Sequence, residues 1–483
     1  VDDAQFSGRD GLHVRDCFLM KRIADFATVN SKDSLNRVVD LFEYVNRNID
    51  LEEQDPNLPP NTLYAAIFFG TGSAEDRAWV FASLLKQLRI DALILRPNKS
   101  PDNLDERAAA RRWLVGVPLD GRVYLFDTRL GTPIPSPEDD GKSALVRKPA
   151  TLSEVKEHDD LLRTLDLPDG RVYPLRSEDF SHLRVEVVGE ISDWVPRMAR
   201  LQKELAGEHS AVIYDPLEDR DGNEGALSRA VNAGDGLWET ADVSIWPHPE
   251  SATEGFESRS DEKGGNFQVK DLPFHSPFRF QVTETGLTAV PTSEHQRGRT
   301  QQLVGDYEGA IANYNNSLIE QNLDHIEQSG VYKVPEAHKF AHFVAADNAT
   351  IWTAVSHLEE NDPSAALNTL KKYKRRYQKT NVSGPWSDLC HALLAQILAS
   401  RGDYAAALQE LAEIPATAPE RDGCDLLARR WQKLAGDAAG TTTAQIEPSR
   451  APDQQRGDES SNEASSAVDE EGPVAAPKPR ATQ

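Results

Sequence analysis

Apolar residues recur every three or four positions between about Ser34 and Ile49, the spacing of one face of an amphipathic helix. Asp33 or Ser34 can cap the start of this helix, because a short polar side chain there accepts a free backbone N–H. A second stretch, "FFGTGSAEDRAWVFASLLKQLRIDALIL" (68–95), contains a glycine turn, a helix with one apolar face and a short apolar strand. The first segment of the chain therefore predicts helices that pack against a sheet.

Three short apolar runs are the candidate strands of this sheet. They are Ala92–Leu95, Trp113–Leu119 and Val123–Phe126, and the turn Asp120-Gly121 between the last two is a strong hairpin signal. We expect the helix from about Asp76 to Leu88 to pack against these strands. Helices followed by a small antiparallel sheet indicate an α+β fold.

The middle of the chain gives mixed signals. Residues 136–168 are charged and contain prolines, and we interpret them as a connector with a short helix. Residues 169–288 are expected to form a second α+β unit of unknown role. Its predicted elements are a strand at Leu183–Val188, a helix at Trp194–Leu205 and a strand at Ala211–Tyr214.

Residues 289–436 contain a weak repeat. The stretches "GDYEGAIANYNNSL", "NDPSAALNTLKKY" and "GDYAAALQELAEI" align on Ala310, Ala366 and Ala407, each shortly after a turn. Such self-similarity is typical of arrays of helical hairpins, in which a small residue lets two helices approach. These residues resemble the tetratricopeptide repeat, although the spacing between the three alanines is unequal. The resemblance implies all-α hairpins that bind protein or peptide segments.

Composition narrows the choice of partners. A formal charge of −25 and an isoelectric point near 4.9 argue against nucleic acid, because phosphate binding requires a basic surface. The longest apolar run, Leu63–Phe69, is far shorter than the roughly 20 residues that cross a bilayer. Residues 437–483 have no aromatic side chain and are expected to form a disordered tail.

The compartment stays open at this stage. The chain begins with Val1, so either a signal or anchor has been removed, which would place it outside the cell or in the cell envelope, or it is cytoplasmic. Cys17, Cys390 and Cys424 are far apart and odd in number, which indicates neither a disulfide framework nor a zinc site. Cys17 is expected to be a structural or free thiol, and we expect no cofactor.

The stretch 68–95 has most of the features of a nucleophile helix. A cysteine hydrolase places its thiolate at a helix N-terminus beside an imidazole that a carboxylate orients. The stretch resembles the nucleophile helix of the transglutaminase-like superfamily, part of the papain-like cysteine hydrolases, whose pattern is roughly G-x-C-x-D-x-A. The resemblance implies a transglutaminase-like domain at residues 1–135 and puts the cysteine position at Ala74, so the nucleophile is missing.

The segment "RRWLVGVPLDGRVYLFDTRLG" (111–131) matches the two strands that carry the family's base and acid. The match puts the acid at Asp127 and the base at Arg112, or at Arg111 if the register shifts by one. No histidine occurs between His13 and His158 to supply an imidazole. The resemblance implies that Ala74, Arg112 and Asp127 share one cleft, with Arg112 either paired to Asp127 or directed into solvent.

Three other groups of residues are candidate sites. Ser73 is either a substitute nucleophile or an ordinary cap of the helix, and only arginines are predicted near it to act as a base. Glu75 and Asp76 are either paired carboxylates or first-turn acids that the helix dipole favours. His338 and His342 have the spacing of a shared metal, but Lys339 stands where a metalloprotease helix needs glutamate.

We therefore expect a non-catalytic binding or scaffold protein that joins a degenerate transglutaminase-like domain to protein-binding helical repeats. The alternative is a hydrolase or acyltransferase that uses Ser73 or another residue, for example in the middle unit. An assembly scaffold is a third interpretation. An ordinary α+β domain remains the alternative to the family resemblance.

Overall fold

The computed structural model describes residues 5–53, 58–98, 112–167, 169–205, 207, 210–220, 222–234, 236–260, 269–275, 278–283, 286–317, 336–377 and 384–444. Residues 1–437 form one compact unit, and residues 438–483 form a second. The expected disordered tail begins at residue 437, but residues 437–444 are the end of a helix; the rest of the expected tail, from 445 onward, lies outside the described residues. Among the described helices, none combines the length and the apolar character needed to cross a membrane, in agreement with the sequence.

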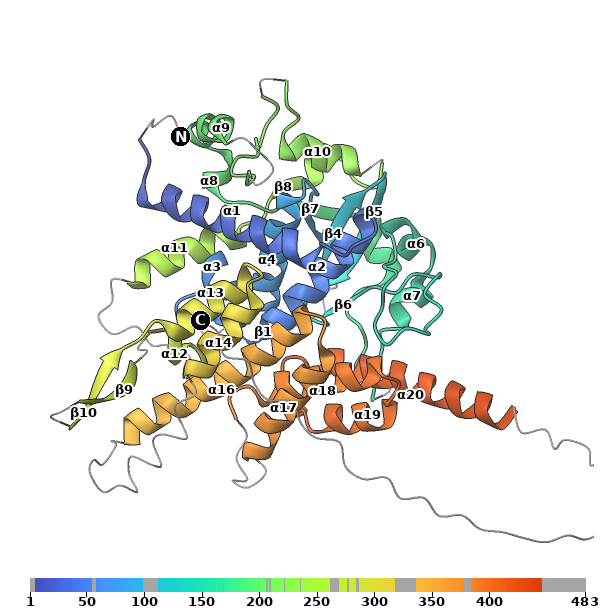
Figure 1. The fold of residues 1–483 in the computed structure, drawn as a ribbon. Helices are drawn as coiled ribbons and strands as arrows, with labels where there is room; N and C mark the ends of the chain where they lie inside the picture. Colours follow the sequence, from blue (N-terminus) through green and yellow to red (C-terminus); the bar gives the residue numbers. More distant parts are fainter. Residues whose placement is uncertain are drawn as a thin grey trace, which may run out of the picture. The chain divides into compact units, whose positions relative to one another are not determined.

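A six-stranded mixed sheet lies at the centre of the first unit (Figure 1). Its strands, in spatial order, are β6 (Thr132–Pro133), β5 (Arg122–Asp127), β4 (Leu114–Leu119), β3 (Leu93–Pro97), β7 (Leu183–Val187) and β8 (Val243–Ile245). Within this sheet β7 and β8 pair in parallel, and the other neighbouring strands are antiparallel. Asp120 and Gly121 both have positive φ, 51° and 73°, as a two-residue hairpin turn requires. The predicted α+β class is confirmed. Because β7 and β8 lie after residue 169, the sheet predicted for the first segment continues into the predicted second unit.

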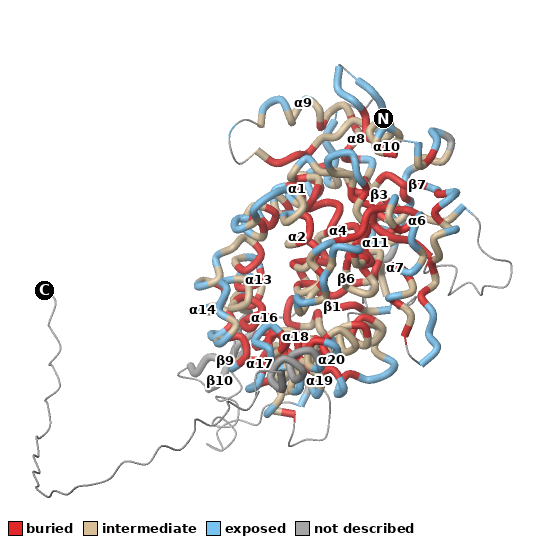
Figure 2. Tube along the Cα trace, turned by 90° about the vertical axis from the view of Figure 1, so that its right-hand side faces the viewer, coloured by how far each residue is buried: buried red, intermediate tan, exposed pale blue. Residues whose placement is uncertain are grey.

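Three helices cover one face of the sheet: α1 (Gly8–Ala27), α2 (Ser34–Asn48) and α4 (Ala74–Gln87). Helix α2 begins where the sequence predicts, with the Asp33 side chain accepting from the Asn36 N–H. Phe42, Phe81 and Phe126 bring α2, α4 and β5 together, with ring centroids 5.1 to 5.4 Å apart. Buried residues gather along these helices and strands (Figure 2). The predicted packing of the second helix on the hairpin strands is confirmed.

The other face of the sheet is covered by the expected connector and by part of the middle unit. The covering elements are α6 (Leu152–Glu157), α7 (Asp159–Arg163), the 3₁₀ turn η2 (Ser177–Ser181) and α10 (Ala226–Ala233). Leu152, Leu162 and Phe180 are buried against the sheet. Residues 136–168 are thus more than a connector, because their helices complete the second half of the core.

One predicted helix of the middle unit is confirmed and one predicted strand is not. The helix expected at Trp194–Leu205 is α9 (Pro196–Glu204), which begins with proline at its first position and follows the short helix α8 (Ile191–Trp194). The predicted strand at Ala211–Tyr214 is wrong. Its backbone bonds to the side-chain amides of Gln87 and Gln202 instead of to a neighbouring strand.

Short elements connect these layers. They are β1 (Asp50–Leu51), α3 (Leu63–Ala65), the π-helical turn η1 (Ala66–Gly70), β2 (Thr71–Gly72), η3 (Thr240–Asp242), α11 (His248–Ser260), η4 (Val269–Asp271), α12 (Leu272–His275) and the hairpin strands β9 (Phe278–Thr283) and β10 (Gly286–Pro291).

The last third of the unit is built of helical hairpins. The described helices are α13 (Glu294–Leu303), α14 (Tyr307–Ser317), α16 (Glu336–Glu359), α17 (Pro363–Tyr377), α18 (Ser387–Ser400), α19 (Tyr404–Ala412) and α20 (Arg421–Ala444). Each hairpin turns at one residue of positive φ: Gly305, Asn361 and Gly402. The aspartate that follows donates its backbone N–H to the carbonyl five residues earlier in all three turns, which closes the preceding helix.

The three aligned alanines occupy the same place in each hairpin. Ala310, Ala366 and Ala407 each lie five residues after the turn and are fully buried. The prediction that these small residues lie at helix–helix contacts is confirmed.

The first helices of two hairpins, α13 and α16, contact the N-terminal half of the chain. Arg299 of α13 donates to the carbonyls of Ile67 and Phe68. Glu359 of α16 pairs with Arg47. These two helices therefore pack on the chain's own residues.

Ala407→Leu should lower the free energy of unfolding by about 1 to 3 kcal/mol, because the added carbons would overpack a contact with no free space. Ala405 lies in the same helix but is exposed, so Ala405→Leu is the matched control and should be nearly neutral. Urea unfolding followed by circular dichroism measures both. Equal midpoints for the two variants would contradict the assigned packing.

Candidate functional site

The N-terminus of α4 is the position that the family resemblance assigned to a nucleophile. Ser73 caps the helix: its hydroxyl oxygen accepts from the Asp76 N–H, and the Asp76 carboxylate accepts from the Ser73 N–H. Ala74 begins the helix, is 6% exposed, and its carbonyl accepts a hydrogen bond of 2.8 Å from the Thr128 hydroxyl. A methyl group thus stands where a thiolate would be needed, and the neighbouring polar groups serve the helix cap.

Arg77 fixes this helix start to its surroundings. Its buried guanidinium donates to the carbonyl of Ile49 at 3.0 and 2.6 Å and to the carbonyl of Thr128 at 3.3 Å. Burial lowers the pKa of Arg77. The end of β5 and the start of α4 are therefore adjacent, as the family resemblance implies.

Arg112 and Asp127 do not join Ala74 in one cleft, and this part of the expectation is wrong. Arg112 precedes β4 and is buried, paired with Asp179 and donating to the carbonyl of Pro174 at 3.2 Å. The carboxylate of Asp127 accepts from the Tyr173 hydroxyl at 2.8 Å. These partners lie on the sheet face that α6 and α7 cover, whereas Ala74 lies on the opposite face.

The two expected arrangements of Arg112, an ion pair with Asp127 or exposure to solvent, are thus both replaced by the pair with Asp179. Asp127 closes the loop after β5 by accepting the backbone N–H groups of Arg129 and Leu130. Burial and the Asp127 carboxylate raise the pKa of Tyr173. The charged groups of Arg112 and Asp127 therefore both have hydrogen-bond or ion-pair partners within the fold.

An imidazole lies beside the start of α4, and it comes from a distant part of the chain. His248, the first residue of α11, places Nε2 3.0 Å from an oxygen of Asp76. Its ring stacks on Trp246 with centroids 5.0 Å apart and meets the edge of Trp79. Because 172 residues separate His248 from Asp76, no local pattern could have predicted this pair.

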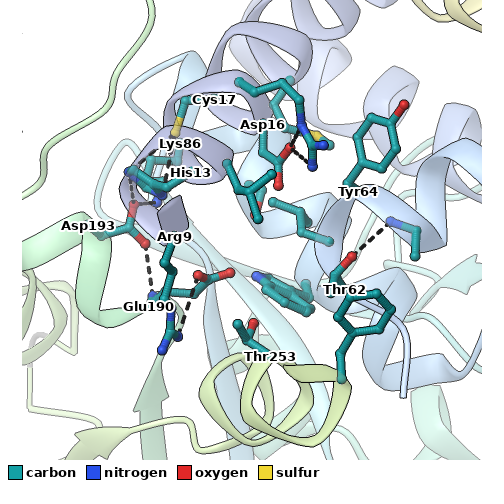
Figure 3. Close-up of a pocket in the computed structure, with 18 of the residues that line it drawn as sticks. Arg9, His13, Asp16, Cys17, Thr62, Tyr64, Lys86, Glu190, Asp193 and Thr253 are labelled. Atoms are coloured by element: carbon teal, nitrogen blue, oxygen red, sulfur yellow. Dashed lines mark hydrogen bonds and ion pairs between the residues drawn. The ribbon is translucent and has the colours of Figure 1, made fainter. Parts of the chain in front are cut away.

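A pocket of about 270 Å³ lies beside α4 (Figure 3). Side chains from α1, α3, α4, α8 and α11 surround it. Its apolar wall consists of Leu12, Met20, Leu63, Tyr64, Phe69, Trp79 and Phe256. Arg15 lies over the ring of Tyr64 at 3.8 Å and pairs with Asp16. The pocket thus offers an apolar body and a charged rim.

The polar end of the pocket holds a thiol, an imidazole and a carboxylate. The Sγ of Cys17 lies 3.6 Å from Nε2 of His13, and this nitrogen lies 3.6 Å from Oδ1 of Asp193. Lys86 pairs with the same oxygen of Asp193. Burial raises the pKa of the Cys17 thiol, which is free as expected. The spacing of His13 and Cys17, one helical turn apart, was the one sequence signal of this cluster.

Glu190 completes the polar end. Burial, followed by the nearby Asp193 carboxylate, raises the pKa of Glu190 to about 8. Arg9 lies between Glu190 and Glu250, at 3.9 Å and 2.8 Å. A carboxyl group in this position is largely protonated at neutral pH.

The remaining predicted sites have less support. His342 is buried in α16, and the side chain of His338 lies outside the described part of the chain. Within the described residues, the one group of three or more metal-ligating side chains is His13, Cys17 and Asp193. Cys390 and Cys424 are buried free thiols.

Comparison with family models, with curated proteins and with solved structures finds no match to this chain. The resemblances to the transglutaminase-like superfamily and to the tetratricopeptide repeat rest on the sequence motifs quoted above.

Glu190→Gln should change the pH dependence of stability. A glutamate pKa near 4.5 in the unfolded chain and about 8 in the folded chain means that the folded state binds more protons between these values. Glu190 therefore costs stability as the pH rises through this window, whereas the uncharged amide of the variant would not. The variant should gain stability relative to the native chain between pH 5 and pH 9 in thermal unfolding. Glu257→Gln, at the exposed rim of the same pocket, is the control; an equal gain there would contradict the assignment.

Proposed function

We propose that this chain is a non-catalytic binding protein, in which a core of the transglutaminase-like type is held by helical hairpins of the tetratricopeptide type. The observation that carries the proposal is the start of α4. There Ala74 supplies no reactive atom, and the matched base and acid positions lie on the opposite face of the sheet. A hydrolase of this class needs a nucleophile, a base and an orienting acid around one point.

The family comparison is supported by the order and packing of the elements. Helix α4 begins after a glycine turn, packs on antiparallel strands β3 to β5, and has the end of β5 beside its first residue. The displacement of Arg112 and Asp127 from Ala74 supports the non-catalytic interpretation over a site in which a single residue has been lost.

The hairpins support an internal role. Arg299, Trp352 and Glu359 on their first helices contact Asn48 and the turn Ile67–Gly70 of the core. A protein or peptide partner, which the repeat resemblance predicts, would then bind the outer helices α14, α17 and α19. This partner remains a prediction.

The pocket beside α4 is the ligand site that we favour. Ligand pockets are commonly concave and mostly apolar, with a few polar groups that orient the ligand. Here Trp79 and Tyr64 provide flat apolar surface, and Glu190 and Arg9 provide the polar groups. A small molecule or side chain with an apolar body and one polar end fits this chemistry.

A hydrolase that uses Ser73 is the second candidate, and one observation favours it. The His248–Asp76 pair places an imidazole and a carboxylate within one turn of the Ser73 hydroxyl. However, Nε2 of His248 is bound to Asp76, and the Ser73 oxygen accepts the cap hydrogen bond. His248 would therefore have to use its other ring nitrogen, Nδ1, as the base.

The purified chain should show no acyl transfer, deamidation or peptide hydrolysis above the buffer rate, and a fluorophosphonate probe should not label Ser73. Ser73→Asn is the sharpest variant, because asparagine keeps the helix cap while removing the hydroxyl. Its background rate should equal that of the native chain. Turnover that disappears in Ser73→Asn or in His248→Ala would overturn the proposal in favour of the hydrolase.

A further inference from the structure

We propose that His13, Cys17 and Asp193 bind one divalent transition-metal ion of the zinc class at the polar end of the pocket. This inference does not depend on the proposed binding function, because it concerns these three side chains alone. Imidazole, thiolate and carboxylate are the side-chain ligands that zinc takes in proteins. All three residues are more than nine-tenths buried.

The distances between the ligand atoms fit one ion. Zinc lies about 2.3 Å from a thiolate and about 2.0 Å from an imidazole nitrogen, so in a tetrahedral site these two atoms are about 3.5 Å apart. The Sγ of Cys17 lies 3.6 Å from Nε2 of His13, and Oδ1 of Asp193 lies 3.6 Å from the same nitrogen. The ligand atoms of all three residues lie within 4.8 Å of one another.

The hydrogen bonding around His13 also favours an ion. Nε2 faces three electron-rich atoms: the Ile213 carbonyl at 2.9 Å, the Cys17 sulfur and the Asp193 carboxylate. A neutral imidazole carries one N–H, so it can donate to only one of them at a time. In the metal-free chain the Ile213 carbonyl, the nearest of the three, accepts this N–H. Metal binding would move the imidazole proton to Nδ1, and the ion would accept electron pairs from the imidazole, the thiolate and the carboxylate together.

The same geometry argues against a catalytic thiol–imidazole pair. In a cysteine hydrolase the carboxylate holds one ring nitrogen while the other faces the thiol. Here Asp193 approaches Nε2, whereas the Cys17 sulfur lies close to both ring nitrogens, 3.6 Å from Nε2 and 3.9 Å from Nδ1. No ring nitrogen is left to the thiol while the other is held by the carboxylate, so the arrangement differs from that proton relay.

Two neighbours shape the site. The second oxygen of Asp193 accepts the Glu190 backbone N–H at 2.9 Å, which orients the carboxylate as outer-shell hydrogen bonds do in metal sites. Lys86 pairs with Oδ1 of Asp193 and neutralises it when no metal is bound. Metal binding must displace this ammonium group into the adjoining pocket, which Lys86 also lines, and the pocket leaves a fourth position for water or a ligand.

Cobalt(II) titration of the metal-free full chain tests the proposal. We expect one equivalent of Co²⁺ to give a thiolate-to-cobalt charge-transfer band and the visible spectrum of a tetrahedral ion, both removed by Zn²⁺. Cys17→Ser should abolish the charge-transfer band, and Asp193→Asn should weaken binding by about tenfold or more. Cys424→Ser, which removes a buried thiol elsewhere, should keep the native spectrum.

Lys86→Met is a variant that should strengthen metal binding, in contrast to the two ligand variants. Removing the competing positive charge should strengthen Co²⁺ binding by about tenfold or more. Circular dichroism at the same temperature establishes that each variant is folded, and the titration of the native chain stands without any variant. The proposal is overturned if the native chain shows no charge-transfer band, if the band survives in Cys17→Ser, or if Lys86→Met does not bind more tightly.

Discussion

The buried guanidinium of Arg299 is the interaction on which the arrangement of the unit depends. It is fully buried and donates to three backbone carbonyls, those of Asn48, Ile67 and Phe68, while lying 3.7 Å from the ring centroid of Trp352. Burial lowers its pKa, which is the cost of removing a charge from water. Such a group is stable only when its donors are satisfied, so Arg299 fixes the helix that carries it against the core.

The segment that Arg299 binds is shaped for this contact. The π-helical turn η1 presents the carbonyls of Ile67 and Phe68, and Gly70 follows with a φ of 77°. A side chain at Gly70 would meet the ring of Trp352 at 2.3 Å, so only glycine allows the hairpin helix to approach. The chain then continues through β2 into α4, so the segment that the hairpins contact leads directly to the N-terminus of α4. This is the physical link between the repeat-like part of the chain and its candidate sites.

The sequence patterns predicted the features that depend on residues close together in the chain. Helices α2 and α4, the Asp120-Gly121 hairpin and the buried alanines after each hairpin turn follow from periodicity, caps and turn residues. Long-range partners were not predictable in this way. The segment 211–214 has the composition of a strand, but two glutamine side chains take its hydrogen bonds. The pairs Arg112–Asp179, Asp76–His248 and His13–Asp193 join residues that are far apart in the chain. No spacing in the sequence predicts these pairs.

Calorimetric unfolding of the native chain, of Arg299→Leu and of its neighbour on the same helix, Arg297→Leu, tests the central claim most directly. The account predicts one cooperative transition for residues 1–437, nearly unchanged in Arg297→Leu because that side chain is exposed. In Arg299→Leu three carbonyls lose their donor at about 1 to 3 kcal/mol each, so the free energy of unfolding should fall by about 3 kcal/mol or more. Two separate transitions in the native chain, with equal behaviour of the two variants, would contradict it.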